Sequence, residues 1–341
     1  MSTPDTTAGG LGSGISLGPT FRSRLDGPVK TGLTVIAALI FVIIAYFLLR
    51  LYLESRPVFS EYGAFRFVTD NAWLPSKASY GAWPLIAGTL ITSVVALAIG
   101  VPVAVASALF LTELCPQRVR GVLTTLVELL AAVPSVVYGL WGVFFLIPKL
   151  KPIEQWFSDT FSFLPFVGGT VAGPNYFIAG LILAIMIIPI VSSISREVLA
   201  TVPREHKEAA LALGATRWEM IRIAVLPYAR PGISGAAMLG LGRALGETIA
   251  VTLVIGNAAR LGDSIFSQGY TLAAVIANEF GEAASDPVHR AALIAAGLVL
   301  FVLTLFVNAI ARWVVTRGER RLAAASRVIQ EPNAPVKESA A

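Results

Sequence analysis

The chain has 341 residues, of which 55% are apolar and only 14% are charged, and its formal net charge is +5. Soluble domains carry about 25% charged residues, and the mean hydropathy of +0.74 lies far on the apolar side. A disulfide-rich secreted scaffold and a disordered chain are excluded, because both need compositions that this sequence lacks and Cys115 is its single cysteine. The composition predicts an all-α polytopic membrane protein, in which the basic residues bear on topology rather than on nucleic-acid binding.

Six apolar segments are long enough to cross a hydrocarbon core of about 30 Å, which takes roughly 20 helical residues. They cover residues 32–53, 84–111, 121–148, 176–195, 223–257 and 291–315. The first is too long for a signal-peptide core and is followed by no small-x-small cleavage site, so we expect it to remain as a membrane helix. The fifth is longer than one crossing and begins with Pro227 and Pro231, so we expect part of it to bend or to lie outside the bilayer.

The distribution of basic residues predicts the topology. If the N-terminus lies in the cytoplasm, the inner side holds 16 of the 26 Lys and Arg residues and the outer loops hold eight. This excess predicts that both termini are cytoplasmic. We expect a flexible extension over 1–29, a six-helix permease domain over 30–317 and a polar tail over 318–341. The outer stretch 265–282 is too short and too polar to span, and we expect a helix there that lies at the outer face.

The loop over 203–227 predicts two short helices that project from the inner face. Pro203 suits a first helical turn, and Gly214 ends the first helix. Thr216 begins the second helix and forms a capping box with Glu219. A partner could approach the loop closely at its alanines and pair with its charges; the residues concerned are Ala209, Ala210, Ala212, Glu208 and Arg217. The alternative is an ordinary amphipathic loop on the membrane surface, and periodicity alone does not choose between the two.

Two charges lie inside the fifth segment. Arg243 and Glu247 are four residues apart, so on one helix they would share a face, and each costs about 2.5–3.5 kcal/mol or more near the bilayer centre. We expect them to pair with each other beside a partner helix or a wet cavity, with Gly242 and Gly246 allowing a close helix crossing. One interpretation is an ion pair that only fixes helix register. The other makes Arg243 the lining of an oxyanion path, because a guanidinium offers paired donors, and Glu247 its partner when the path is empty.

The third segment contains Glu128 and Pro134. Pro134 removes a backbone donor and predicts a kink near the middle of the bilayer. Ser135 and Tyr138 could then offer hydroxyl groups to the path, although such hydroxyls more often bond back to their own or a neighbouring helix. Glu128 could join two helices or belong to the path.

The loop resembles the EAA loop of ABC-importer permeases. The resemblance is carried by Glu208-Ala209-Ala210, by Gly214 and by Leu226-Pro227, and Ala224 departs from the isoleucine that is usual there. It implies a type I importer (MetI-like) fold and a coupling helix that docks into a separate ATPase subunit. This chain has no Gly-x-x-x-x-Gly-Lys-Ser/Thr loop. We therefore expect it to bind no cofactor, with ATP and Mg²⁺ held by the partner ATPase.

Two further stretches narrow the resemblance. Residues 133–142 (Val-Pro-Ser-Val-Val-Tyr-Gly-Leu-Trp-Gly) and 242–251 (Gly-Arg-Ala-Leu-Gly-Glu-Thr-Ile-Ala-Val) look like the PstC-type permeases of phosphate ABC importers. The sister PstA-type permeases usually follow Gly-Glu-Thr with Ala-Pro. The resemblance runs over about 30–317. It implies a heterodimer with a PstA-type permease, a dimer of ATP-binding subunits, an external phosphate-binding protein, and a role for Arg243 and Glu247 in the movement of inorganic phosphate through the cell membrane.

Other functions remain as alternatives. A permease for sulfate, molybdate or another oxyanion fits a single arginine equally well, and Glu128 and Glu247 would also suit a proton-driven secondary transporter. An intramembrane enzyme is disfavoured, because the spans contain no nucleophile–base pair. A transition-metal site has little to build from, because Cys115, His206 and His289 form no cluster in the sequence.

Overall fold

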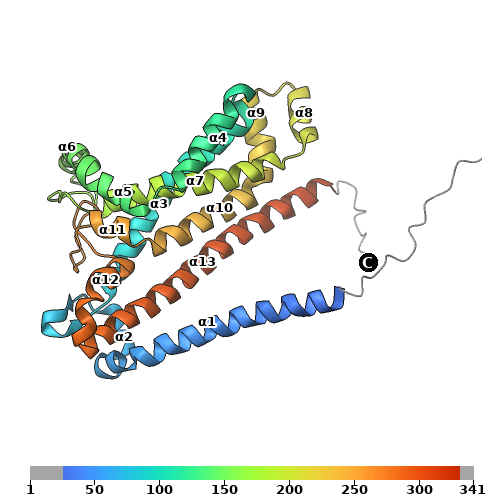
Figure 1. Cartoon of the computed structure of the whole chain (residues 1–341). Coiled ribbons are helices and arrows are strands. Elements are labelled where there is room, and N and C mark those ends of the chain that lie inside the picture. Colours follow the sequence, from blue (N-terminus) through green and yellow to red (C-terminus); the bar gives the residue numbers. More distant parts are fainter. Residues whose placement is uncertain (1–25, 331–341) are drawn as a thin grey trace, which may run out of the picture. The chain divides into compact units, whose positions relative to one another are not determined.

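The computed structural model describes residues 26–330, and most of them are helical (Figure 1). The chain divides into two compact units, Met1–Arg50 and Leu51–Ala341. The described part of the first unit is the beginning of helix α1 (Asp26–Tyr62). Its sequence is apolar on every side, which is typical of a membrane span rather than of a surface helix.

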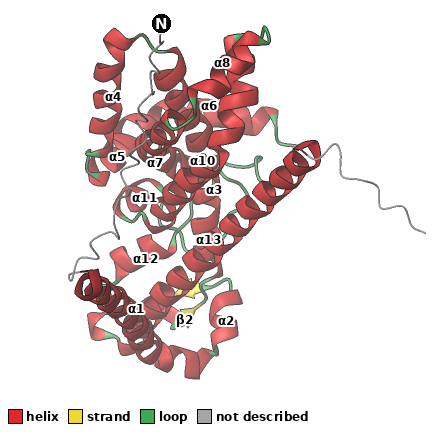
Figure 2. Ribbon diagram, turned by 90° about the vertical axis from the view of Figure 1, so that its right-hand side faces the viewer, coloured by secondary structure: helices red, strands yellow, loops and turns green. Residues whose placement is uncertain are grey.

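The second unit is built from short and long helices with one small hairpin (Figure 2). The hairpin pairs Trp73 with Tyr80 in antiparallel register. The segments η2, η3 and η4 are π-helical, and η1 and η5 are 3-10 helices. In chain order the elements after α1 are α2 (Ala64–Thr69), β1 (Trp73–Leu74), η1 (Pro75–Lys77), β2 (Ser79–Tyr80), α3 (Trp83–Leu109), η2 (Phe110–Leu114), α4 (Gln117–Ala131), α5 (Ser135–Trp141), η3 (Gly142–Leu146), α6 (Ile147–Thr160), α7 (Tyr176–Ala200), α8 (Arg204–Ala212), α9 (Arg217–Met220), η4 (Ile221–Val225), α10 (Leu226–Gly246), α11 (Ile249–Val254), α12 (Leu272–Glu279), η5 (Glu282–Ser285) and α13 (Pro287–Gln330).

Within residues 26–330, five helical stretches are long and apolar enough to span a membrane. They are Val29–Tyr62, Trp83–Leu114, Ser135–Thr160, Tyr176–Ala200 and Pro287–Arg317. The prediction of an all-helical polytopic protein is confirmed. The last helix continues through the predicted boundary at 317 to Gln330, and most of the predicted extension over 1–29 lies outside the described residues.

Two of the predicted segments have the wrong bounds. The third, 121–148, is divided at residues 132–134, and the spanning stretch runs instead from Ser135 to Thr160. Lys149 and Lys151, counted above in an outer loop, therefore lie in α6. The fifth, 223–257, is divided into α10 and α11, and α10 with its two arginines is too polar to be one of the five stretches.

Helix α7 forms the centre of the second unit. It packs against α3, α10 and α4, and most of its side chains are buried. The approach to α3 is close because Gly180 has no side chain: a Cβ there would lie 2.5 Å from Cγ1 of Val95. Because α7 runs through this core for 25 residues, or about 37 Å, its two ends fix the positions of two distant loops.

One end of the second unit has its own aromatic core. Trp73 and Tyr80 of the hairpin pack edge to face at 5.4 Å, next to the beginning of α13. The predicted helix within 265–282 is present as α12, but Leu272, Ala274 and Val275 are buried in this core. The first half of α12 is therefore a core element and is not free to lie on a membrane surface.

Candidate functional site

The chain leaves helical geometry at Pro134. Helix α4 ends at Ala131, and α5 begins at Ser135 with Pro134 in an extended conformation (φ −59°, ψ 140°) just before it. The kink predicted at Pro134 is therefore a complete break. Non-helical backbone at membrane depth is tolerated only where it is buried in protein or lines a wet cavity, so the break marks a candidate site.

A second break separates Arg243 from Glu247. Helix α10 ends at Gly246, Glu247 is extended (φ −69°, ψ 131°), and α11 begins at Ile249. The expectation that the two charges share one helical face is wrong, because the backbone turns away before Glu247. Within residues 26–330 no ion pair joins them at 4.0 Å or less. Arg243 lies in the last turn of α10, where the helix dipole favours a cation.

The two short helices that follow the breaks pack against each other. A Cβ at Gly139 of α5 would lie 2.6 Å from Cδ1 of Leu253 and 3.1 Å from Cα of Ala250, both in α11. Gly142 allows a similar approach to Val254. The role of these glycines was not predicted. At Gly242 and Gly246 no atom of another described element lies within 4 Å of such a Cβ, so the close crossing predicted there is not made by the described residues.

The polar residues near the breaks belong to three helices. Arg243 is exposed, and its charge acts on the hydroxyl of Tyr138 in α5, so the two side chains lie near each other. The Tyr138 hydroxyl donates to the carbonyl of Leu130 in α4 at 2.8 Å and so crosses the first break. Ser135 is half-buried at the start of α5. The arrangement presents an exposed guanidinium, whose paired donors suit an anion better than an apolar ligand.

The loop over 203–227 has the predicted local structure. Gly214 has φ +84°, which ends α8, and Thr216 begins α9 with a complete capping box. The Thr216 backbone N–H donates to Oε2 of Glu219 at 2.8 Å, and the Glu219 N–H donates to Oγ1 of Thr216 at 3.3 Å. These bonds, first from the backbone and then from the hydroxyl of Thr216, lower the pKa of Glu219. At this end α8 and α9 project from the second unit (Figure 1).

The surface of this loop is more apolar than predicted. Leu213 is 89% exposed and Trp218 is 63% exposed, and neither was singled out from the sequence. Glu208, Ala209 and Arg217 are exposed as expected. Ala210 is buried with Met220 and Ile221, so the expectation that a partner approaches at Ala210 is wrong. Exposed large apolar side chains beside charges are typical of a protein-docking surface.

Ion pairs connect this loop and its support. Lys207 of α8 pairs with Glu113 of η2 at 2.6 Å, and both side chains are mostly buried. Arg120 donates to the carbonyls of Thr112 and Cys115 and holds the turn between η2 and α4. These residues were missed, because Lys207 and Glu113 are 94 positions apart.

Glu128 has a structural partner. It pairs with Arg196 of α7 at 2.6 Å, and its side chain is 51% exposed. The interpretation of Glu128 as a residue that joins two helices is supported by this contact, which ties α4 to the central helix.

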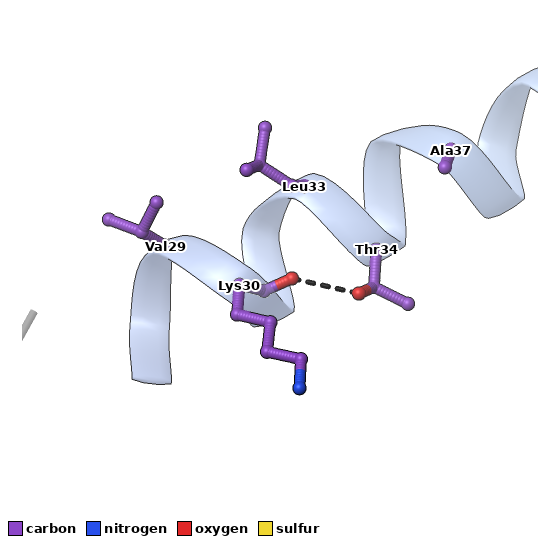
Figure 3. Close-up of a pocket in the computed structure, with 5 residues that line it drawn as sticks. All are labelled: Val29, Lys30, Leu33, Thr34 and Ala37. Carbon is purple, nitrogen blue, oxygen red and sulfur yellow. Dashed lines mark hydrogen bonds between the residues drawn. The ribbon is translucent and has the colours of Figure 1, made fainter. Parts of the chain in front are cut away.

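A hollow on α1 offers a weaker candidate. It has a volume of about 460 Å³ and is lined by Val29, Lys30, Leu33, Thr34 and Ala37, all from one helix (Figure 3). The Thr34 hydroxyl already donates to the Lys30 carbonyl at 2.8 Å. Among the described residues no second element forms an opposite wall, so the hollow defines no specific ligand. In the part of the chain that the structure describes, no three His, Cys, Asp or Glu side chains form a group that could hold a metal ion.

Comparisons with known proteins agree with this architecture. Residues 100–320 match the model of the family described as binding-protein-dependent transport system inner membrane component. The chain is 44% identical over 293 residues to the phosphate transport system permease protein PstC of Mesorhizobium japonicum, covering 84% of this chain and 89% of that protein. It is 46% identical over 280 residues to PstC 2 of Mycobacterium tuberculosis, covering 80% and 86%.

Two solved structures share the fold. Both are of a bacterial ABC transporter that imports the acidic polysaccharide alginate, and each match covers 86% of this chain and 99% of that chain. The TM-scores are 0.50 at 21% identity and 0.52 at 19% identity, the second from a complex with an alginate pentasaccharide-bound periplasmic protein. At these identities the similarity shows the fold alone.

Proposed function

The chain belongs to the binding-protein-dependent transport system inner membrane component family, among the PstC permeases, and on this premise we propose that it is a subunit of an ATP-driven importer of inorganic phosphate. As a member of this family it is a multi-pass membrane protein and a transporter component rather than an enzyme. The proposal concerns its substrate, its partners and the residues that move the substrate.

The exposed Arg243 carries the proposal. A guanidinium that faces lipid near the bilayer centre costs about 2.5–3.5 kcal/mol or more, so the face that presents Arg243 must be covered by a partner or by water. The break before Glu247 follows Arg243 by one helical turn, and Tyr138 of α5 lies near enough for the charge of Arg243 to act on its hydroxyl. A phosphate path between this face and a PstA-type sister permease satisfies the charge, because phosphate oxygens accept paired hydrogen bonds from a guanidinium.

The partners follow from the two ends of α7. Its last residue leads to α8, where Glu208, Arg217, Leu213 and Trp218 are exposed for docking to a dimer of ATP-binding subunits. Its first residue lies at the opposite end, where an extracytoplasmic phosphate-binding protein delivers the substrate. The excess of basic residues on the α8 side supports cytoplasmic termini. ATP and Mg²⁺ bind to the ATPase partner, and this chain holds no cofactor.

Substitution of Arg243 tests the path. In vesicles that contain the complete complex and the binding protein, we expect Arg243→Ala to abolish uptake of labelled phosphate while the subunits still copurify. Arg230→Ala is the matched control, because Arg230 is an exposed arginine on the same helix, 13 positions from Arg243 and away from the break. Normal uptake by Arg243→Ala would contradict the lining role.

Three further measurements test the coupling to ATP hydrolysis, the selectivity for phosphate and the energy source of transport. Glu208→Lys reverses an exposed charge on α8, and we expect it to uncouple ATP hydrolysis from the loaded binding protein. Unchanged phosphate-stimulated hydrolysis would argue against docking at Glu208.

Competition by sulfate or molybdate for uptake of labelled phosphate separates a phosphate permease from a permease for other oxyanions. Uptake that continues without the ATPase subunits would support proton-driven transport instead.

A further inference from the structure

A polar cavity lies at the end of the second unit that is opposite α8. Its volume is about 350 Å³, and two loops, over 161–175 and 255–271, form its walls. Helix α7 begins beside it and extends about 37 Å toward α8. The polar side chains that line it are Thr170, Arg260, Asp263, Ser267 and Gln268.

The walls of the cavity are held by hydrogen bonds between the loops. The backbone N–H of Ala172 donates to the Phe266 carbonyl at 3.1 Å, and that of Tyr176 donates to the Ser267 carbonyl at 3.2 Å. The Ser264 hydroxyl donates to the Val167 carbonyl at 3.1 Å. Asn257 has φ +53°, an uncommon conformation for a residue with a side chain, and its amide donates to the Thr252 carbonyl. A cavity with fixed walls loses little conformational entropy when it binds a ligand.

The cavity and Arg243 lie near opposite ends of the same short helix, α11. From the break before Ile249, α11 extends six residues, or about 9 Å, to Val254. Both walls are attached to its end, because the N–H of Asn175 donates to the Val254 carbonyl and that of Gly269 donates to the Ile255 carbonyl, each at 3.1 Å. A ligand in the cavity is thus one short helix away from the proposed path.

The lining groups have unused hydrogen-bonding capacity. Among residues 26–330, the five polar side chains make no hydrogen bond and no ion pair with the chain: Thr170, Arg260 and Asp263 are exposed, and Ser267 and Gln268 are half-buried. The guanidinium, the two hydroxyls and the amide can donate to oxygen atoms. The carboxylate of Asp263 can only accept, so it favours a ligand that carries a proton and disfavours one that does not. Inorganic phosphate keeps an acidic proton near neutral pH, whereas sulfate has none.

We propose that this cavity is an outer binding site for a protonated oxyanion, in which Arg260 binds the ligand's oxygens and Asp263 accepts its proton-bearing oxygen. The inference rests on the proposed function and deepens it by naming where phosphate binds before it reaches Arg243. Asp263 is then a residue that selects phosphate over sulfate.

The test measures binding of labelled inorganic phosphate to the purified complete complex without the binding protein. We expect Arg260→Ala to weaken phosphate retention by about tenfold or more, the value for loss of one hydrogen bond to a charged group, and Arg260→Lys to restore part of it. Arg290→Ala is the matched control, because Arg290 is an exposed arginine in the first turn of α13 and does not line the cavity. Copurification of the subunits and basal ATP hydrolysis show that each variant is assembled.

Selectivity provides the second measurement. In the wild-type complex we expect sulfate to compete poorly with labelled phosphate, and we expect Asp263→Asn to reduce this difference by about tenfold. Arg243→Ala should still retain phosphate at the outer site, so failure of the path and failure of this site are distinguishable. Two results would overturn the proposal. One is that the wild-type complex shows no saturable retention of phosphate. The other is that Arg260→Ala retains phosphate as well as the wild type does, and if this variant also lost association with the binding protein, Arg260 would belong to a docking surface instead.

Discussion

Two contacts in the second unit are made by different forces: the contact between α8 and its support, and the contact between α5 and α11. α8 is held by the ion pair of Lys207 and Glu113 and by a small apolar cluster that includes Ala210. α5 and α11 meet instead through Gly139, where a Cβ would lie 2.6 Å from Cδ1 of Leu253 and 3.1 Å from Cα of Ala250. Long charged side chains can keep an ion pair while their helices shift, whereas close-packed interiors transmit displacement without giving way.

This difference separates an adjustable joint from a rigid one. We infer that a displacement of α8 reaches α3 through Glu113, which continues the α3 helix as part of η2. We also infer that α5 and α11 move as one body. The breaks at 132–134 and 247–248 directly precede this body, and segments of this kind absorb the changes in φ and ψ when domains move.

The largest expected effect is at the rigid joint. Gly139→Val adds three carbons where a single Cβ would already lie 2.6 Å from Cδ1 of Leu253 and 3.1 Å from Cα of Ala250, so the Leu253 side chain must move and the added methyl groups push α5 and α11 apart. We expect a loss of about 3 kcal/mol, the upper end of the range for over-packing, and loss of phosphate uptake. Thermal unfolding of the purified complex measures the first effect, and uptake into vesicles measures the second.

Gly121→Val controls for the helix propensity of valine. Gly121 lies inside α4, and no atom would lie within 4 Å of a Cβ there. We expect this variant to retain uptake and nearly wild-type stability. Equal losses in the two variants would show that the contact between α5 and α11 has no special role.

The adjustable joint should respond to charge. Lys207→Ala leaves Glu113 mostly buried without its partner, and we expect a loss of about 2 kcal/mol of local stability around α8. ATP hydrolysed per phosphate imported should rise, because α8 no longer transmits its displacement fully. The charge swap of Lys207→Glu with Glu113→Lys should restore this ratio. A double variant that is no better than either single one would contradict the role of the pair.

The same two regions show what a sequence can predict. The loop was predictable because its signals are local: Gly214 permits a positive φ, and Thr216 and Glu219 satisfy each other's backbone three residues apart. Pro134 was also predictable, because its ring restricts its own backbone and that of its neighbour. The break before Glu247 was not, because nothing local in Gly-Glu-Thr forbids a helix.

Contacts between distant residues account for the remaining errors. Lys207 and Glu113 are far apart in the sequence, and only the fold brings α8 next to η2. Ala210 was misjudged and Leu213 was not singled out, because the side of α8 that faces its support depends on tertiary packing, which buries Ala210 and leaves Leu213 exposed. The cavity near Arg260 was missed for the same reason, since its two walls come from separate loops.

The capping box of α9 should have a smaller effect than either joint. Thr216→Ala removes the side-chain cap, and we expect a loss of about 1 kcal/mol in the local stability of α9. Amide hydrogen exchange of residues 217–220 in the complex measures this. Thr216→Ser, which keeps the hydroxyl, is the matched control, and exchange as slow as wild type in Thr216→Ala would contradict the cap.

The cap should also depend on pH. The pKa of Glu219 is lower in the folded loop than in an unfolded chain, because the carboxylate accepts hydrogen bonds from Thr216. The contribution of the Glu219 carboxylate to the stability of α9 is therefore complete above the unfolded pKa of about 4.3. It is lost as the pH falls through the lower pKa of the folded loop. Hydrogen exchange of the same amides should show protection that disappears only in acid. At each pH the rates are compared with those of Glu219→Gln, because the comparison cancels the pH dependence of intrinsic exchange. Protection that did not change with pH relative to the variant would contradict this linkage.

The smallest expected effect concerns Glu128. Its pair with Arg196 is half exposed, so Glu128→Gln should cost only about 0.5 kcal/mol, and the new amide oxygen can still accept from Arg196. Because we assign Glu128 to helix packing and not to proton transfer, we expect phosphate uptake to remain at the wild-type level. A glutamine cannot carry a proton, so a tenfold loss of uptake with intact assembly would support a proton-driven mechanism. Since the pair joins α4 to α7 and belongs to neither joint, it gives the background against which the losses at Gly139 and Lys207 should be judged.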